Sequence, residues 1–370
     1  MSVELDKIKS NDIHYRTHVV RSEKEQLADF CSAMQNNTSL TELMVRQVGK
    51  EIQEISSLSA VIQKNQSLTK VSFEGVYIAN AGAAVLASAL FVNATLTDLD
   101  LGNCGLTLMS GLVPALKQNK KLVKLSLKSN AFANAGCDAL AEALTYGGST
   151  LTELNLSSCN ITNINSLSSS LTTNANLRTL DLSQNEFGDE GGVALGVALR
   201  TNKCLRTLKI VSCGLTFTNK LETAGKNYIT TFIDMLKANG TLLSLDLSAN
   251  TLGNVGQKLA AAIKENQALN EVRMVGCSTG EKVIAEIDGY TKRNREQGSQ
   301  QNSKITDSKI LSSAPGASTA QSTTNKAAKA TAATVVQLNN EMKIPTKQFL
   351  EPVIVDRARV TKIKNATSPN

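Results

Sequence analysis

The sequence predicts an α/β solenoid, in which one short strand and one helix repeat along the chain and each repeat packs on its neighbours. Leucines open the repeats at steps of 26 to 29 residues, with one step of 37, and a period of this size is typical of stacked repeats. The third and fifth positions after each opening leucine are apolar, as in a half-buried strand. Apolar residues also lie ten and six positions before each opener, on one face of a helix. The opening leucines are Leu40, Leu68, Leu96, Leu122, Leu151, Leu177, Leu205, Leu242 and Leu269.

The N-terminal segment is predicted to cap the solenoid with one strand and one helix. Residues 13–20 have the character of a strand, and residues 22–25 form a capping box that begins a helix ending near Met34. On such a strand His14 and His18 would share one face about 13 Å apart. We interpret them as satisfied or solvated side chains rather than as a metal pair or a catalytic base.

Each repeat begins with the pattern Leu-x-x-Leu-x-Leu-x-x-(Cys/Asn), and its last position ends the strand. A side chain there must hydrogen-bond backbone groups that are left unpaired as the chain turns inward. Asparagine can donate and accept, whereas cysteine tolerates burial and offers a weak S–H donor. The first two copies carry Val48 and Val76 and are interpreted as edge repeats. The later copies alternate Cys104, Cys159, Cys213 and Cys277 with Asn130, Asn185 and Asn250.

Asparagines are also predicted to mark both ends of the helices. One asparagine lies three residues before nearly every opener, where a helix exit commonly needs a left-handed residue. In alternate repeats a good helix N-cap lies twelve residues after the opener. Two repeat types therefore alternate along the chain. The exit residues are Asn37, Asn65, Asn93, Asn119, Asn174, Asn202, Asn239 and Asn266, and the predicted N-caps are Asn80, Asn134, Asp189 and Asn254.

These repeats resemble leucine-rich repeats of the ribonuclease-inhibitor-like class, which also occur in NOD-like receptors, Ran GTPase-activating proteins and some bacterial effectors. The resemblance covers residues 13–277. It implies a horseshoe with parallel strands on the concave face and helices on the convex face. It implies no catalytic residue, because the residues through which such proteins touch a target are not part of the repeat motif.

Composition divides the chain into a balanced solenoid and a basic C-terminal part. Up to Cys277 there are 25 Lys and Arg against 24 Asp and Glu, so six of the seven net positive charges follow it. From residue 299 a Ser, Thr, Ala and Gln-rich stretch buries too little surface to order itself. The last segment is either a docking motif or export signal, or a disordered tail with accidental hydrophobes. The predicted divisions are 1–39 capping strand and helix, 40–277 nine repeats, 278–298 capping helix, 299–333 linker and 334–370 tail.

The seven cysteines are predicted to be free thiols of a cytoplasmic protein. Cysteines of the alternating column lie two strands apart, about 10 Å, which exceeds the ~7 Å limit for bridging Cα atoms. An odd count and a first segment without an apolar signal both favour a reducing compartment. The column spacing and the absence of histidine after His18 disfavour a metal site.

The sequence also argues against an enzyme. Gly225 and Lys226 lack the rest of a phosphate-binding loop, and no His-Glu-x-x-His motif is present. Because both histidines lie in the N-terminal cap, no Ser-His or Cys-His nucleophile pair is available along the repeats. We expect no cofactor and no metal.

The concave face is predicted to consist of the residues two, four and six positions after each opener. This surface is polar, mixed in sign and without tryptophan, so a charge-guided contact is expected rather than a very tight one. The alternative is that its Ser and Asp residues only solvate the strands. The repeat that opens at Leu205 is longer than the others and carries an insertion between Leu215 and Leu236. This insertion either forms a loop on the rim of the binding surface or has no functional effect. The predicted partner-binding residues are Asp98, Asp100, Lys124, Lys128, Glu153, Asn155, Asp181, Lys209, Asp246, Arg273, Lys226 and Tyr228.

Together these features predict a non-enzymatic scaffold that binds a partner protein through the concave face and the rim near residues 215–236. Neither nucleic-acid binding nor membrane insertion is expected, because the basic residues of the tail are dispersed. The resemblance to effectors and the tail suggest delivery from an intracellular bacterium into a host cell. The alternative function is that of a GTPase-activating protein for a small GTPase.

Overall fold

The computed structural model describes residues 2–21, 24–47, 52–145, 149–217 and 228–311. The chain divides into two compact units, Met1–Ser308 and Lys309–Asn370, and the sheet with its helices lies in the first. Outside the described residues fall Ser22 and Glu23 of the predicted capping box, Val48, Lys226 and everything after Leu311.

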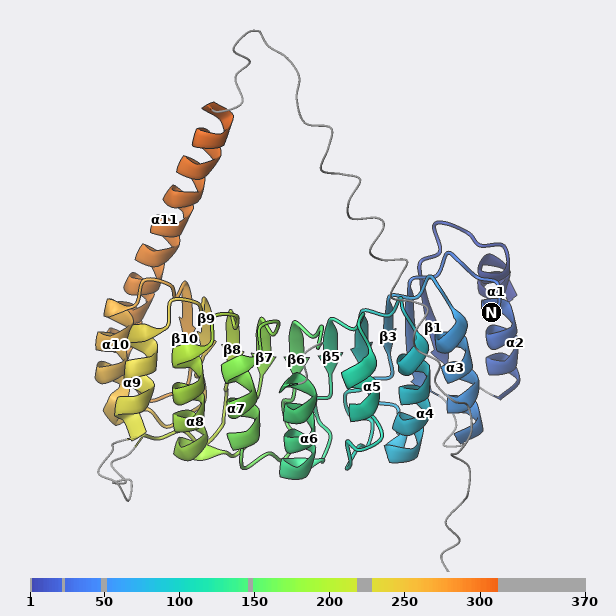
Figure 1. Ribbon diagram of the computed structural model, residues 1–370, viewed down its shortest axis with the longest axis horizontal. Helices are drawn as coiled ribbons and strands as arrows, with labels where there is room; N and C mark the ends of the chain where they lie inside the picture. The colour runs from blue at the N-terminus through green and yellow to red at the C-terminus, as the bar shows by residue number, and fades with distance from the viewer. Residues whose placement is uncertain (1, 22–23, 48–51, 146–148, 218–227, 312–370) are drawn as a thin grey trace, which may run out of the picture. The chain divides into compact units, whose positions relative to one another are not determined.

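Ten strands form one sheet in which every neighbouring pair is parallel and the strands follow the order of the chain (Figure 1). Equivalent repeat positions face each other, since Lys70 pairs with Asp98 and Asp98 with Lys124. The predicted solenoid of strand-and-helix repeats is confirmed. The strands are β1 Thr17–Arg21, β2 Glu42–Gln47, β3 Lys70–Ser72, β4 Asp98–Asp100, β5 Lys124–Ser126, β6 Glu153–Asn155, β7 Thr179–Asp181, β8 Thr207–Lys209, β9 Ser244–Asp246 and β10 Glu271–Arg273.

The helices of the repeats stand in a row on one side of the sheet, and the other side of the sheet is open (Figure 1). In each three-residue strand the middle residue is buried, as Leu99 and Leu125 are, while its neighbours face the open side. The helices are α1 Ser2–Lys9, α2 Lys24–Met34, α3 Ile52–Lys64, α4 Ala79–Val92, α5 Val113–Gln118, α6 Ala133–Thr145, α7 Asn165–Thr173, α8 Gly188–Thr201, α9 Tyr228–Ala238, the 3-10 turn η1 Gly253–Val255, α10 Gly256–Glu265 and α11 Glu281–Leu311.

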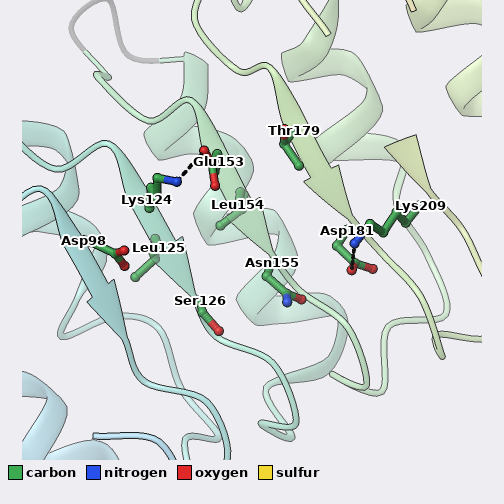
Figure 2. A pocket seen from close by; sticks show the side chains of 10 residues that line it. All are labelled: Asp98, Lys124, Leu125, Ser126, Glu153, Leu154, Asn155, Thr179, Asp181 and Lys209. Carbon is green, nitrogen blue, oxygen red and sulfur yellow. Dashed lines mark ion pairs between the residues drawn. The ribbon is translucent and has the colours of Figure 1, made fainter. Parts of the chain in front are cut away.

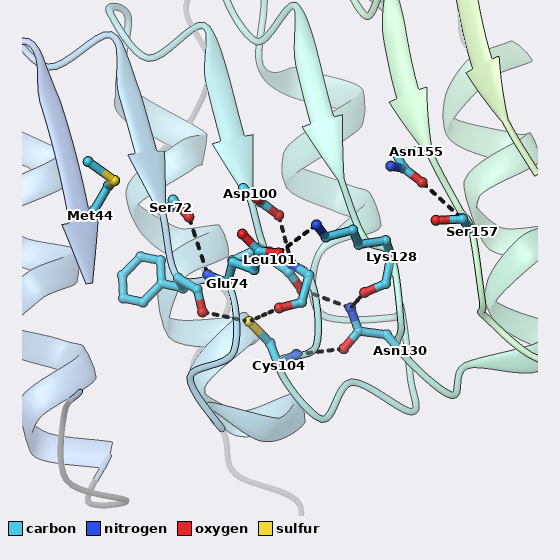
Figure 3. A network of polar contacts seen from close by, with 12 residues as sticks. Met44, Ser72, Glu74, Asp100, Leu101, Cys104, Lys128, Asn130, Asn155 and Ser157 are labelled. Atoms are coloured by element: carbon cyan, nitrogen blue, oxygen red, sulfur yellow. Dashed lines mark hydrogen bonds and ion pairs between the residues drawn. The ribbon is translucent and has the colours of Figure 1, made fainter. Parts of the chain in front are cut away.

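A buried column of amides and thiols joins each repeat to the one before it. The Asn130 amide donates to the Leu101 carbonyl at 2.8 Å, and its oxygen accepts the N–H of Cys104 at 3.0 Å (Figure 3). The amide also donates to the Leu127 carbonyl at 2.8 Å, and the oxygen accepts the N–H of Leu106 at 3.0 Å. Asn185 and Asn250 make the same set of bonds one repeat pair further along the chain. The strand-end slot therefore satisfies buried backbone groups, as the sequence predicted.

Cysteine fills the same slot as a donor in the alternate repeats. The Cys104 thiol donates to the carbonyl of Phe73 at 3.2 Å (Figure 3), and the Cys159 thiol to that of Leu127 at 3.3 Å. These carbonyls are equivalent to Leu101, which accepts from Asn130. Burial raises the pKa of both thiols to about 12, and all seven cysteines are free.

The asparagines that precede the openers are not left-handed, so that prediction is wrong. Asn93 has φ −68° and ψ 129°, which is an extended conformation. Its oxygen accepts the N–H of Leu96 at 2.7 Å, and its amide donates to the carbonyl of Ile62 at 2.7 Å in the preceding repeat. These asparagines are required for their side-chain hydrogen bonds between repeats and not for their backbone freedom.

The residues that were predicted to cap helices form hydrogen bonds with the next repeat. Helix α4 begins after Ile78 and has no side-chain cap, because Asn80 already lies inside the helix. The Asn80 oxygen accepts the N–H groups of Thr107 and Leu108, at 2.9 and 3.0 Å. Asn134 and Asp189 make equivalent bonds to the following loop, and Asn254 lies in η1. Helix capping was therefore the wrong interpretation of this column.

The N-terminal end of the sheet differs from its prediction. The helix α1 was not predicted, and β1 begins at Thr17, so His14 lies outside the strand and does not share a face with His18. The His18 ring is buried, stacks on Phe30 at 5.1 Å between centroids and shares a hydrogen bond of 2.7 Å with the Tyr15 hydroxyl. His18 is therefore a core residue.

The last helix seals the C-terminal end of the sheet. The Asn294 amide donates to the carbonyls of Asn266 and Leu269, at 3.0 and 2.9 Å, and the Asn266 carbonyl is equivalent to the Asn239 carbonyl that Asn266 itself binds. Arg293 donates to the Asn266 carbonyl at 2.9 Å. The helix ends at Leu311, beyond residue 298 where the capping helix was predicted to end, so the first residues of the predicted linker are helical.

Candidate functional site

We use the term open face for the first and third residues of strands β3 to β10, which lie on the side of the sheet without helices. The buried middle residue is Leu or Val in all eight strands, whereas the outward residues differ from strand to strand. The repeat thus keeps its core constant and varies only the side chains that face solvent.

A shallow hollow of about 330 Å³ lies at the centre of the open face (Figure 2). Its wall spans β4 to β8, and Figure 2 shows the charged side chains projecting from successive strands. The structure thus brings six of the predicted residues together: Asp98, Lys124, Glu153, Asn155, Asp181 and Lys209.

Ion pairs between neighbouring strands hold the charged side chains of the hollow. Lys124 Nζ lies 2.7 Å from Glu153 Oε1, and Lys209 Nζ lies 3.7 Å from Asp181 Oδ2. The hydrogen bond that Lys124 donates to Glu153 raises the pKa of Lys124, and burial raises the pKa of Asp98 against the opposing effect of Lys70 and Lys124. Exposed pairs contribute about 0 to 1 kcal/mol each, so they order the surface more than they stabilise the fold.

The third residue of β4, β6, β7 and β9 also has a structural role. One carboxylate oxygen of Asp100 accepts the N–H of Gly102 at 2.9 Å, and those of Asp181 and Asp246 accept the N–H of Ser183 and Ser248 at 3.0 Å. Asn155 makes the same bond at 2.9 Å to Ser157 (Figure 3). These side chains close the turn after the strand and present their remaining oxygen atoms to solvent.

The other predicted residues lie away from the hollow. Lys128 follows β5 and pairs with Glu74 at 2.5 Å, which raises the pKa of Lys128 and lowers that of Glu74 (Figure 3). Arg273 on β10 pairs with Glu271 on the same strand at 2.6 Å. Tyr228 begins α9 and lines a second hollow of about 550 Å³ beside the start of α8, with Thr162, Glu186, Phe187, Gly188, Asp189, Glu190, Gly214 and Thr216.

Three open-face residues at or beside the hollow were not among the predicted partner-binding residues. Ser126 and Thr179 line the hollow, and Lys70 precedes it on β3. All three occupy the second or fourth position after an opener, so the repeat pattern itself places them on this face.

Metal-binding clusters, reactive thiols and membrane-spanning helices were each considered as functional features of the described residues. Within the described ranges no group of three or more His, Cys, Asp or Glu side chains is arranged to hold a metal ion. Burial raises the pKa of the Cys137 and Cys213 thiols to about 12, so they remain protonated near neutral pH. In the same ranges, no helix combines the length and hydropathy needed to cross a bilayer.

The chain matches the family model "Leucine Rich repeat" over residues 92–108, 118–141, 149–164 and 173–196. Mouse ribonuclease inhibitor is 32% identical over 206 residues, which cover 54% of this chain and 43% of the inhibitor. Pig ribonuclease inhibitor is 36% identical over 152 residues, or 40% and 33% of the two chains. The mouse NACHT, LRR and PYD domains-containing protein 14 is 32% identical over 237 residues, or 62% and 23%.

These matches show that the chain contains leucine-rich repeats. Its repeats are of the ribonuclease-inhibitor-like class, as their alternating Cys and Asn columns predicted. The chain spans between a quarter and a half of the length of these relatives. Two solved structures are also similar. The leiomodin-1 actin-binding site 2 has a TM-score of 0.33 and 17% sequence identity, and the match covers 40% of this chain and 79% of that one. The Caenorhabditis elegans tropomodulin C-terminal domain has a TM-score of 0.34 and 13% sequence identity, and the match covers 51% of this chain and 95% of that one.

Proposed function

We propose that this chain is a protein-binding scaffold without enzymatic activity, and that its partner binds the open face. The observation that carries the proposal is the division of labour within each repeat. The buried middle residue of each strand is repeated, whereas the outward residues differ in charge and shape between strands. Such a surface is rigid and specific in its order, which suits recognition of another macromolecule.

The relatives support a protein partner, since two of them are named as inhibitors of ribonuclease, itself a protein. The rim beside the insertion is included in the proposal, because Tyr228 lines a hollow next to the acidic residues Glu186 and Glu190. A cytoplasmic location and delivery as a bacterial effector both stay predictions, and the relatives named above are mammalian.

Affinity capture with matched variants tests the proposal. The bait is the chain, with the double substitution Lys124→Ala and Glu153→Ala on the open face as the test variant. The control removes the Lys117 and Glu142 ion pair, which joins helices α5 and α6 of the neighbouring repeats on the helix side. Partners should be captured by the chain and by the control but lost with the open-face variant. Equal capture by all three baits would refute binding through the open face.

Two further arms test the remaining parts of the proposal. A chain ending at Gly298 should capture the same partner, because the open face lies entirely before that residue. The alternative function of a GTPase-activating protein is tested by GTP hydrolysis with a panel of small GTPases. Stimulated hydrolysis would replace the non-enzymatic proposal.

A further inference from the structure

The charges of the open face follow an order that is broken at one place. Within the three residues of each strand from β3 to β9, all charged residues have the same sign. From β3 to β9 the signs run positive, negative, positive, negative, negative, positive, negative. The two adjacent negative strands are β6 and β7, and we call the line between them the seam. The residues are Lys70, Asp98, Lys124, Glu153, Asp181, Lys209 and Asp246.

The lysines on the strands that flank the seam form ion pairs with the acidic residues of the seam. Lys124 pairs with Glu153 from β5, and Lys209 pairs with Asp181 from β8 (Figure 2). The sheet register places Thr179 opposite Glu153 and Asn155 opposite Asp181. The strands on both sides of the seam therefore carry two carboxylates and two neutral residues, at the centre of the hollow.

Alternating charges recognise a partner only at close range, because their fields cancel at distances beyond the strand spacing. The seam is the exception, since two like charges adjoin there and their fields add. A partner is thus oriented first by the seam and then by contacts to the flanking strands.

The spacing of the strands selects the partner's secondary structure. Six strand intervals of ~4.8 Å span about 29 Å, whereas six helical turns of 5.4 Å cover about 32 Å. Residues on the same face of an extended chain lie about 6.7 Å apart, so six such steps cover about 40 Å. The side chains of an extended partner would therefore no longer align with the strands after the second strand. Apart from Asp100, the charges also shift from the first strand residue in β3 to β6 to the third in β7 to β9, which fits a helix crossing the strands at a tilt.

We propose that the open face binds an α-helix of the partner that lies across the strands. The helix carries one charged residue per turn, in the order acid, base, acid, base, base, acid, base from β3 to β9. The adjacent bases meet Glu153 and Asp181 at the seam. A strictly alternating face would bind equally in registers two strands apart, whereas the seam mismatches two of the five overlapping turns after such a shift. This inference rests on the proposed function, because it specifies the occupant of the same face.

Designed helical peptides test the inference without knowledge of the natural partner. The matched peptide presents three glutamates and four lysines in the order above, at spacings of three or four residues on an alanine and glutamine background. The alternating peptide has the same composition in the order base, acid, base, acid, base, acid, base, and satisfies at most four strands in any register. A third peptide carries the matched order on alternate residues of a proline-containing extended sequence. Binding is measured by fluorescence anisotropy at low ionic strength.

The matched helix should bind at least five-fold more tightly than either of the other peptides. The double variant Glu153→Gln and Asp181→Asn should weaken binding of the matched helix at least three-fold, because the two adjacent lysines lose their partners, whereas Lys117→Gln with Glu142→Gln on the helix side should leave that affinity unchanged. Equal affinities, preference for the extended peptide, or no binding by any peptide would overturn the inference. If the open-face variant still loses a captured partner in that case, the proposed function stands and only its helical occupant is wrong.

Discussion

The buried column of amides and thiols lies at the ends of the strands, and the open face lies on the outward side of the same strands. The residues of the column are repeated, whereas those of the open face vary. In the column Asn130, Asn185 and Asn250 make the same bonds in every copy. On the open face no two neighbouring strands from β3 to β9 carry the same set of outward residues. The comparison teaches that stability is repeated along this chain, whereas recognition depends on the order of residues that are not repeated.

The largest expected effect comes from removing one amide of the column. Asn185 is 1% exposed and binds four backbone groups of Cys159, Ile161, Leu156 and Leu182 at 2.8 to 3.0 Å. Asn185→Ala leaves these groups without partners, at about 1 to 3 kcal/mol each before water enters. We expect a loss of about 4 kcal/mol in the free energy of unfolding, measured by urea denaturation. A loss below about 1 kcal/mol would show that the column does not hold the repeats together.

A smaller effect is expected for the thiol in the alternate repeat. Cys159→Ala removes a weak donor to the carbonyls of Leu127 and Ser157 and leaves a small cavity. We expect a loss of about 1 to 2 kcal/mol with unchanged binding of the partner or the matched peptide. Weaker binding at an unchanged unfolding midpoint would contradict the separation of the two regions.

The N-terminal strand extends the comparison to a buried group that ionises. Burial lowers the pKa of His18, with Glu4 opposing the effect, so the folded state prefers the neutral ring. His18 therefore contributes its full stability above its unfolded pKa of about 6.5, and this contribution is lost as pH falls below that value. The unfolding midpoint of the chain should fall between pH 7 and pH 5 by more than that of His18→Phe. Parallel pH profiles of the two proteins would refute this role.

The smallest effect on stability is expected on the open face itself. Glu153 and Lys124 are 43% and 48% exposed, so Glu153→Gln should change the free energy of unfolding by less than about 0.5 kcal/mol. The same substitution should weaken binding of the matched peptide, because it neutralises one side of the seam. A change above 1 kcal/mol in urea denaturation would assign a structural role to this pair.

Repetition explains which features could be predicted from the sequence. Nine copies of one pattern identify the strands, the buried slot at Cys104 and Asn130, and the outward positions. The bonding partners of Asn80 and Asn93 could not be predicted, because they lie in the neighbouring repeats, about 28 residues away in sequence, and local rules suggested caps and left-handed exits. The added helix α1 and the length of α11 occur once, so no second copy reveals them. The order of charges at the open face was visible in the sequence, but the seam acquires meaning only when the register joins β6 to β7.

The hydrogen bonds of Asn294 to Asn266 and Leu269 attach the last helix to backbone groups of the preceding repeat. One of these two carbonyls is the one that an internal repeat offers to the repeat that follows, since Asn266 binds the equivalent carbonyl of Asn239. Duplication of one repeat in the gene would therefore lengthen the open face by about 4.8 Å and leave the same closing helix able to seal it. The size of the recognition surface can thus change in steps of one strand while both ends of the protein remain intact.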